Sequence, residues 1–245
     1  MQLYILFGYT TEEIYDIFKE YSKSIKYVEI KNILKLIYGI LIKRKIIVKG
    51  LNSGNIIKEI INKKCIEKGI KNINEIKMPL LIPTVDLYTG KVYYFSSKEK
   101  RGKISDDIIF ESNENIGKIV QASCSYPLVF EPCKLKNKEF IDGGIRENIP
   151  WRANLKMGAD KVISVVFEKD LLENCCNNII DVIDNSINIL KHELSNYELF
   201  GADYLIKIKT KNVGLLDISK IDELYKLGYY TTKKQIEKIK KLMRK

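Results

Sequence analysis

Residues 122–166 read ASCSYPLVFEPCKLKNKEFIDGGIRENIPWRANLKMGADKVISVV, and this stretch decides the fold. Two short apolar segments at 128–130 and 139–141 are typical of strands, and the second ends in Asp142-Gly143-Gly144. After a helix-like segment, residues 161–167 form the near-continuous apolar run of a buried parallel strand. Strands separated by helices predict an α/β fold with a mostly parallel central sheet flanked by helices.

The same alternation continues in both directions along the chain. A capping box at Thr10–Glu13 opens one helix, which presents Ile14, Ile17, Phe18 and Tyr21 on a single face. Further helices are expected at 29–44, 54–69, 115–124, 151–157 and 179–199 and in most of the chain after 208, with strands at 80–85, 91–95 and 204–208.

Composition excludes several classes of protein. The chain has 245 residues, 45% of them hydrophobic, and a formal net charge of +11. Its lysines are spread along the whole length rather than clustered with aromatic residues, so we expect a solvated surface and no nucleic-acid partner. Five cysteines without metal-type spacing and a single histidine argue against a metal site and favour free thiols in a reducing cytosol. No stretch approaches the roughly 20 apolar residues of a spanning helix, and no signal peptide is expected.

Several short motifs follow one another in order: Ala122–Pro127, Phe130-Glu131-Pro132, Asp142-Gly143-Gly144, Asn148-Ile149-Pro150 and Gly158-Ala159-Asp160 ahead of a strand. This ordered set resembles the C-terminal half of the bacterial patatin-like phospholipases. Pro83–Gly90 is similar to the Thr-Asp-Leu-x-Thr-Gly segment of these proteins, and Leu6–Glu13 resembles the stretch after their nucleophile helix. The resemblance implies a patatin-like domain at 1–167, with 168–245 as a helical extension whose one strand packs on the same core.

The resemblance implies acyl transfer by a serine–aspartate dyad, in which Asp142 of the Asp-Gly-Gly motif is the general base. The substrate would be a lipid or another ester, and no cofactor or metal is implied. A simpler interpretation is that Asp142 only shapes a turn, in which Gly143 and Gly144 supply positive φ angles.

The nucleophilic serine of that dyad is absent from this sequence. Neither a glycine-rich oxyanion loop nor a Gly-x-Ser-x-Gly elbow occurs, and Gly50-Leu51-Asn52-Ser53-Gly54 places its serine one position too late. We therefore expect an N-terminally incomplete fold without its first strands, oxyanion loop and nucleophile elbow, and no activity from this chain alone.

Several other residues are expected to have structural roles. Ser123 and Ser125 precede Pro127 without an elbow, which favours packing or capping. The only histidine, His192, lies in the middle of a long amphipathic helix and is expected to be exposed or packed against a neighbour. The loop after Asp142 is expected to be fixed by Arg146, Asn148 and Trp151.

Two functional readings stay open: a lipid acyl hydrolase, and a non-catalytic pseudoenzyme that binds lipid or a membrane surface. We expect a cytoplasmic protein. Peripheral contact with an anionic membrane is left open, and the sequence gives no expectation about the oligomeric state. One segment for such contact is 232–245, with seven basic residues, one acidic residue, and Ile236, Ile239 and Met243 at helical spacing. A solvated terminal helix packed by that apolar stripe is the alternative.

Overall fold

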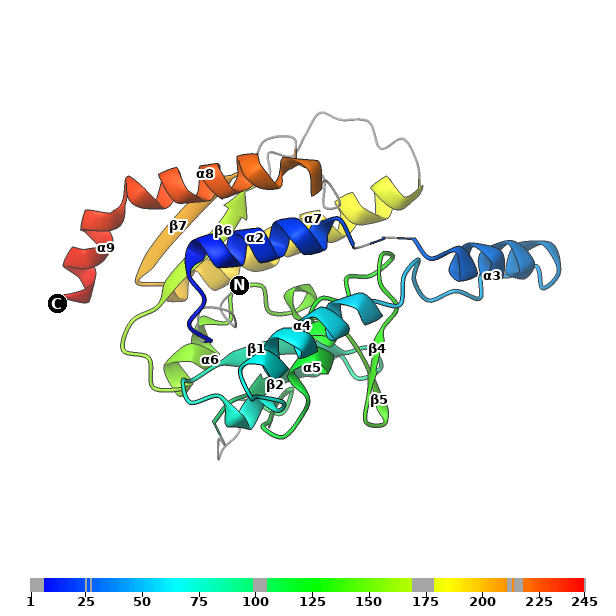
Figure 1. Cartoon of the computed structure of the whole chain (residues 1–245), viewed down its shortest axis with the longest axis horizontal. Helices are drawn as coiled ribbons and strands as arrows, with labels where there is room; N and C mark the ends of the chain where they lie inside the picture. Colours follow the sequence, from blue (N-terminus) through cyan, green and yellow to red (C-terminus); the bar gives the residue numbers. More distant parts are fainter. Residues whose placement is uncertain are drawn as a thin grey trace. The chain divides into compact units, whose positions relative to one another are not determined.

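The computed structural model describes residues 7–24, 26, 28–98, 105–168, 179–210, 213 and 218–244. The chain divides into two compact units, Met1–Asn148 and Ile149–Lys245 (Figure 1). This division by contacts falls before the expected domain limit at 167, which stays a prediction.

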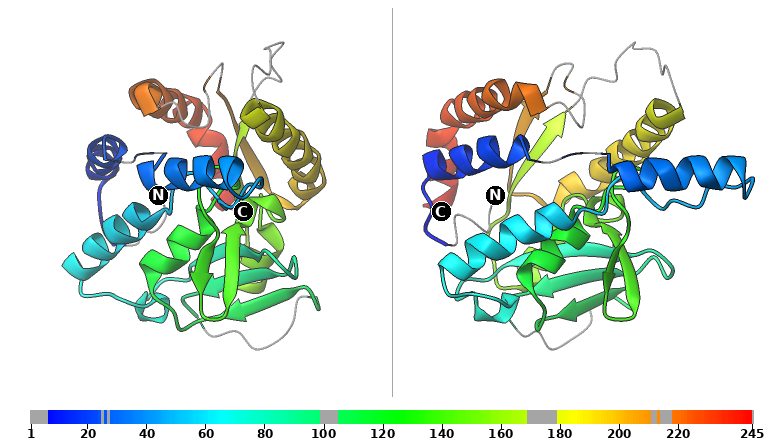
Figure 2. Two further views of the ribbon diagram at one scale, coloured as in Figure 1. Left: turned by 90° about the vertical axis from the view of Figure 1, so that its right-hand side faces the viewer. Right: turned by 45° about the vertical axis from the view of Figure 1, so that its right-hand side comes forward.

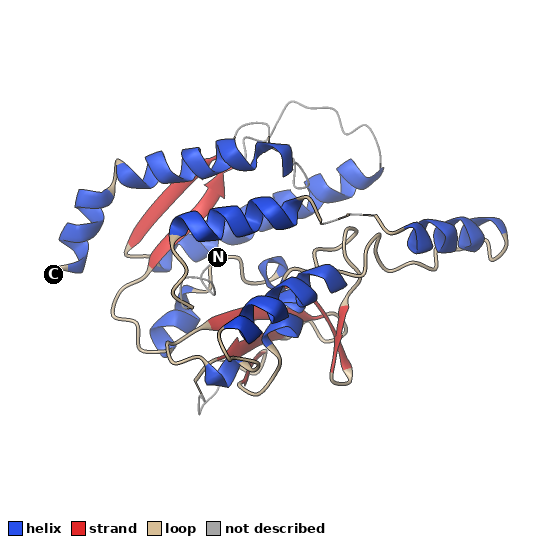
Figure 3. Cartoon of the chain, viewed as in Figure 1, coloured by secondary structure: helices blue, strands red, loops and turns tan. Residues whose placement is uncertain are grey.

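The first unit is built on a five-stranded sheet in the order β3-β2-β1-β5-β4. Its strands are β1 (Leu81–Asp86), β2 (Val92–Ser96), β3 (Ile108–Glu111), β4 (Cys133–Leu135) and β5 (Lys138–Asp142). Its helices are α2 (Thr11–Ser22), α3 (Ile30–Leu41), α4 (Asn55–Glu67) and α5 (Ile116–Ser123), with short 3-10 turns η1 (Ile73–Glu75) and η2 (Gly143–Ile145). Figure 3 shows the strands as a layer beside α4 and α5, so the α/β class with flanking helices is confirmed.

The strands of this sheet run mostly antiparallel, contrary to the expectation of mostly parallel strands. β1 pairs antiparallel with β2 and β5, β4 pairs antiparallel with β5, and β2–β3 is the parallel pair. The links explain the difference: β1–β2 and β4–β5 are joined by short turns, and a parallel pair needs a crossover of about a dozen residues. The strand expected at 128–130 is instead a turn, in which Leu128 has a φ of 74°.

The core of the first unit lies between this sheet and its helices. The Phe140 ring of β5 meets the rings of Tyr93 and Phe95 of β2 edge to face, at centroid distances of 5.1 and 5.9 Å. From α5, Ile116 and Ile119 are fully buried in the same cluster. Edge-to-face rings pack densely and fix the register of the strands that carry them.

Helix α2 begins as the sequence predicts. The Thr10 hydroxyl accepts a hydrogen bond from the Glu13 amide at 3.2 Å, and the Glu13 carboxylate accepts one from the Thr10 amide at 2.7 Å. The predicted capping box is therefore confirmed. Ile14 and Ile17 are buried in the core, whereas Phe18, expected on the same face, is exposed.

The second unit is built on a parallel pair of strands, β6 (Ile163–Glu168) and β7 (Tyr204–Lys209). Its helices are α6 (Trp151–Lys156), α7 (Ile179–Glu198), α8 (Ile221–Lys233) and α9 (Ile236–Met243), with 3-10 turns η3 (Leu199–Gly201) and η4 (Ile218–Lys220). The parallel pairing agrees with the prediction, but β6 is not buried on both faces: Val165 is 52% and Phe167 70% exposed. In the two-stranded sheet, β6 has β7 as its partner.

Helix α9 packs on this small sheet through the centre of its apolar stripe. Ile239 is buried against Ile206 and Ile208 of β7, while Met243 is exposed. This arrangement favours the alternative in which the terminal helix uses its stripe for packing. In the described part of the chain, no helix is long and apolar enough to cross a membrane.

The contact between α4 and α5 depends on the absence of a side chain at Gly117. A Cβ added there would lie 2.6 Å from the Lys58 carbonyl oxygen of α4. We expect Gly117→Ala to lower the free energy of unfolding by about 1–3 kcal/mol through overpacking. The measurement is urea unfolding.

The matched control is Gly228→Ala in α8, where the nearest atom to the added Cβ is Ile208 Cδ1 at 3.9 Å. This change should instead stabilise by about 0.5–1 kcal/mol, because alanine favours a helix interior over glycine. If Gly117→Ala were as stable as the unmodified chain, α4 and α5 would not be in the close contact described.

Candidate active site

Asp142 is the last residue of β5, and its backbone is held from two directions. In the β1–β5 pairing it lies opposite Thr84, which is fully buried. Its amide donates a hydrogen bond to the Ser125 carbonyl oxygen at 3.1 Å, just beyond the end of α5. The sheet and the loop after α5 therefore fix the position of the Asp142 backbone, from which the carboxylate extends.

The Asp142 side chain is oriented by the turn that follows it. Its Oδ1 accepts a hydrogen bond from the Gly144 amide at 2.7 Å and so caps the 3-10 turn η2. Hydrogen bonds to an ionised carboxylate are roughly twice as strong as neutral ones. Asp142 thus shapes a turn, and the same bond gives the half-buried carboxylate a defined direction.

The reason for glycine at position 143 differs from the one expected. Neither Gly143 nor Gly144 is among the glycines with positive φ. Instead, a Cβ added to Gly143 would lie 2.7 Å from the Pro83 carbonyl carbon of β1. Only a residue without a side chain allows the chain after Asp142 to lie this close to β1.

The serines near Asp142 have structural hydrogen bonds, in agreement with the sequence. The Ser123 hydroxyl donates to the Pro83 carbonyl oxygen at 2.8 Å, and the buried Ser125 hydroxyl donates to the Gln121 carbonyl oxygen at 2.8 Å. The more distant Ser53 donates to Glu29 Oε1 at 2.6 Å, next to the start of α4.

Cys124 lies between the two serines, and sequence reasoning did not connect it with Asp142. Taken as a whole residue, Cys124 is exposed at the surface. Desolvation by the protein around its thiol, followed by the negative charge of Asp142, raises the pKa of the Cys124 thiol above its usual value. The thiol is therefore protonated at neutral pH and unsuited to be a nucleophile.

The turn between β1 and β2 contains a second, more deeply buried carboxylate. Asp86 is 2% exposed, accepts a hydrogen bond from the Tyr88 amide at 3.1 Å, and pairs with Lys138 Nζ at 3.2 Å. Burial alone would raise its pKa, but hydrogen bonds from Thr89, Tyr88 and Lys138 outweigh it and lower the pKa below the usual value. These contacts hold Asp86 within its own turn and make it a structural carboxylate.

Arg146 connects the loop after Asp142 with this turn. Its guanidinium donates to the Gly90 carbonyl oxygen and forms an ion pair with Asp107 at 3.0 Å. Of the other two residues expected to fix this loop, Asn148 is exposed, whereas Trp151 begins α6 in the second unit. The Trp151 ring packs so closely on Gly201 that a Cβ there would collide with it.

His192 is exposed on α7, where its Nδ1 lies 3.5 Å from the Asn196 amide nitrogen one turn further along the helix. This agrees with the expected surface position. Among the residues that the structure describes, no group of three or more histidine, cysteine, aspartate or glutamate side chains could hold a metal ion.

We expect Asp86→Asn to destabilise the chain by about 2 kcal/mol at neutral pH, because it removes a charged acceptor from buried hydrogen bonds. A lowered folded-state pKa means that this contribution is present above about pH 4, the unfolded value, and is lost as the pH falls through the folded-state pKa. The free energy of unfolding, measured with urea at several pH values, should therefore fall less steeply below about pH 4 in the variant than in the unmodified chain.

The control for this measurement is Asp16→Asn, at an exposed position of α2. It should leave both the stability and its pH dependence nearly unchanged. Equal acid limbs for Asp86→Asn and the unmodified chain would mean that Asp86 is not a buried, ionised carboxylate.

A family model described as patatin-like phospholipase matches residues 3–155, which is more than half of the chain and includes every strand of the first unit. The matched region contains Asp142 with its two glycines and the β1–β2 turn. The chain therefore belongs to the patatin-like phospholipase family.

Proposed function

We propose that this chain provides the carboxylate of a lipid acyl hydrolase, with Asp142 as the general base of a serine–aspartate dyad. The observation that carries the proposal is the position of Asp142 in an Asp-Gly-Gly motif. Its backbone is bound to Ser125, and its Oδ1 is bound to the Gly144 amide. A general base needs such a fixed position relative to the group that it deprotonates.

In the proposed reaction, the hydroxyl oxygen of a serine attacks the ester carbonyl, and Asp142 takes the hydroxyl proton. The tetrahedral intermediate then collapses, the bond to the leaving alcohol breaks, and Asp142 returns the proton to that alcohol. Water then attacks the acyl-serine that remains, and Asp142 takes a proton from the water. The bond to the serine oxygen breaks, Asp142 returns the proton to that oxygen, and the fatty acid is released. Backbone amides of a glycine-rich loop would stabilise the oxyanion.

The serine and the glycine-rich loop are the parts that residues 1–245 do not contain. The hydroxyl groups of three serines donate hydrogen bonds to oxygen atoms of the protein: Ser53, Ser123 and Ser125. We therefore propose that the chain alone is inactive, and that a segment carrying Gly-x-Ser-x-Gly must be joined to it for turnover.

The substrates of the proposed enzyme are lipids or related esters, as the family implies. We propose a cytoplasmic protein that meets these substrates at an anionic membrane surface, for which its net charge of +11 is suited. No cofactor takes part in the proposed reaction.

A second candidate function is lipid binding without catalysis. The absence of Gly-x-Ser-x-Gly from this sequence favours it. A pseudoenzyme of this kind would bind lipid and hydrolyse none, even after the missing motifs are supplied. The two candidates are therefore distinguished by restoring the nucleophile.

The test joins an N-terminal segment from a complete family member, with its glycine-rich loop and Gly-x-Ser-x-Gly, to this chain. We expect the fusion to hydrolyse p-nitrophenyl esters, while the unfused chain stays at background. In the fusion, Asp142→Asn should abolish turnover, by about 10³-fold or more. The amide oxygen can still accept the Gly144 hydrogen bond, so the turn is kept, but the amide cannot take the serine proton.

His192→Ala is the control in the same fusion and should change the rate little. Circular dichroism of each variant checks that the fold is intact. An active Asp142→Asn fusion would make Asp142 a turn residue only, whereas serine-dependent hydrolysis by the unfused chain would locate the nucleophile within residues 1–245.

A further inference from the structure

Helix α3 presents its apolar face away from the rest of the first unit. Ile30, Leu34, Ile37 and Leu41 follow one another at the spacing of a helical stripe, yet their exposed fractions are 75%, 61%, 47% and 70%. Next to this stripe, further large apolar side chains are also exposed: Ile33, Tyr38, Ile40, Ile42 and Ile46. A surface helix of a globular protein normally turns such a stripe toward the core.

The opposite face of α3 is the one in contact with protein. Asn32 and Gly39, two turns apart on that face, are both buried. A Cβ added to Gly39 would lie 2.7 Å from the Lys45 carbonyl oxygen and 2.8 Å from Ile47, so the returning segment packs directly on the helix backbone. The contact face is therefore specified by glycine and asparagine, and a rotation of α3 to bury its apolar stripe would break this packing.

Residues 30–46, which comprise α3 and the turn after it, form an arm whose base is anchored to the first unit. The Asn32 side chain donates to the Gly50 carbonyl oxygen at 3.3 Å, and the Glu29 amide donates to the Leu51 carbonyl oxygen at 2.9 Å. In turn, the Leu51 amide donates to the Val129 carbonyl oxygen at 3.1 Å. Figures 1 and 2 show α3 extending away from the five-stranded sheet from this base.

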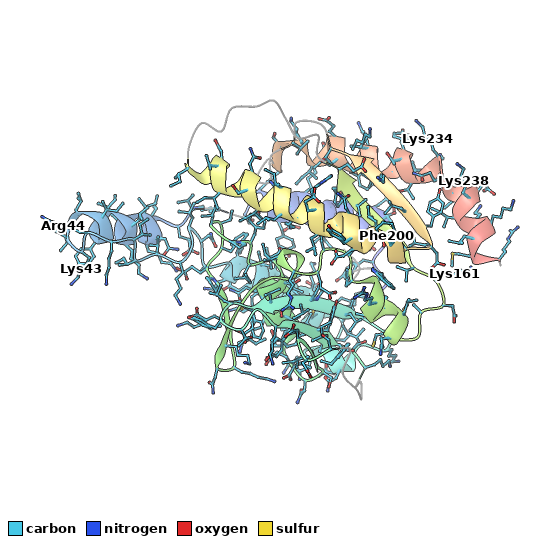
Figure 4. The ribbon with its side chains drawn as sticks, turned by 180° about the vertical axis from the view of Figure 1, so that it is seen from behind. Lys43, Arg44, Lys161, Phe200, Lys234 and Lys238 are labelled. Atoms are coloured by element: carbon cyan, nitrogen blue, oxygen red, sulfur yellow. The ribbon has the colours of Figure 1, made fainter. Side chains whose placement is uncertain are left out.

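The charges on the arm are all of one sign. Residues 30–46 contain five basic side chains and no acidic one. Lys43, Arg44 and Lys45 form the tight turn after α3, and Figure 4 shows Lys43 and Arg44 at the far end of the arm. The two remaining basic residues, Lys31 and Lys35, are exposed on the helix itself.

We propose that residues 30–46 form a docking arm that inserts the apolar face of α3 into the surface of an anionic phospholipid membrane, with Lys43–Lys45 against the lipid phosphates. Choosing lipid as the occupant rests on the proposed lipid hydrolase function. A 12-residue helix is about 18 Å long, too short to span a bilayer but suited to its interface.

Charge complementarity favours a membrane over a second copy of this chain. Two copies packed through α3 would bring together two arms without a single acidic residue between 30 and 46 to pair with their lysines. An anionic membrane supplies both an apolar layer and negative phosphates. The arm is also a better candidate for this contact than α9, whose central Ile239 is buried within the second unit.

The test is sedimentation of the chain with vesicles of phosphatidylcholine alone or mixed with phosphatidylglycerol. We expect binding that needs phosphatidylglycerol and weakens with salt. The variant Leu34→Gln/Ile37→Gln/Leu41→Gln should weaken it by about tenfold or more, because exposed apolar area that inserts into lipid is lost. The control Ile66→Gln/Met78→Gln/Leu155→Gln, also at exposed apolar positions, should bind as the unmodified chain does.

Charge is tested separately with Lys43→Gln/Arg44→Asn/Lys45→Gln, in which asparagine suits the positive φ of 52° at Arg44. This variant should lose most binding to phosphatidylglycerol. The control Lys63→Gln/Lys77→Gln/Lys118→Gln removes the same net charge at exposed positions away from the arm. This control should keep most of the binding to vesicles that contain phosphatidylglycerol. Thermal unfolding by circular dichroism verifies that every variant is folded.

The proposal is overturned if the arm variants bind like their controls, or if binding is equal with and without phosphatidylglycerol. It is also overturned if the unmodified chain forms a dimer that the apolar arm variant abolishes while vesicle binding is unaffected. Because vesicle binding is measured without turnover, these outcomes are independent of whether Asp142 is a catalytic base.

Discussion

The close approach of Gly143 to the Pro83 backbone is the constraint on which the candidate site depends. A side chain at position 143 would lie 2.7 Å from the Pro83 carbonyl carbon, so the chain can follow β1 at this distance only with glycine there. The Ser123 hydroxyl binds the oxygen of the same carbonyl at 2.8 Å. One peptide group of β1 therefore positions both the end of α5 and the start of the turn that holds the Asp142 carboxylate.

This constraint connects packing with chemistry in the proposed reaction. The backbone of Asp142 is fixed by Ser125, and its carboxylate is fixed by the Gly144 amide. A base held by main-chain groups keeps its position without a third residue, which suits a dyad that has no histidine. The arm at residues 30–46 would add the other requirement of a lipid hydrolase, a means of staying at the surface where its substrate is.

The sequence predicted features that depend on local patterns. The capping box at Thr10 and the α/β class were both predictable from residue types and spacing. The strands β3 and β4 were not predicted, because four and three residues are too short for a clear period. The predicted strand direction was wrong because direction follows from the short links between paired strands, as in β1–β2 and β4–β5, and not from the apolar pattern within a strand.

The roles of individual side chains depended even more on contacts that no pattern shows. Gly143 is needed for a close approach to β1 rather than for a positive φ. The helix at Ile30–Leu41 was predicted, but its outward apolar face follows from Asn32 and Gly39 packing inward.

The most direct test of the account is the rate at which a fluorophosphonate probe labels the serine of the fusion protein. If Gly143 sets the position of Asp142, Gly143→Ala should slow labelling by about tenfold or more while the chain stays folded. Labelling at the unmodified rate would contradict the claim that this contact places the base.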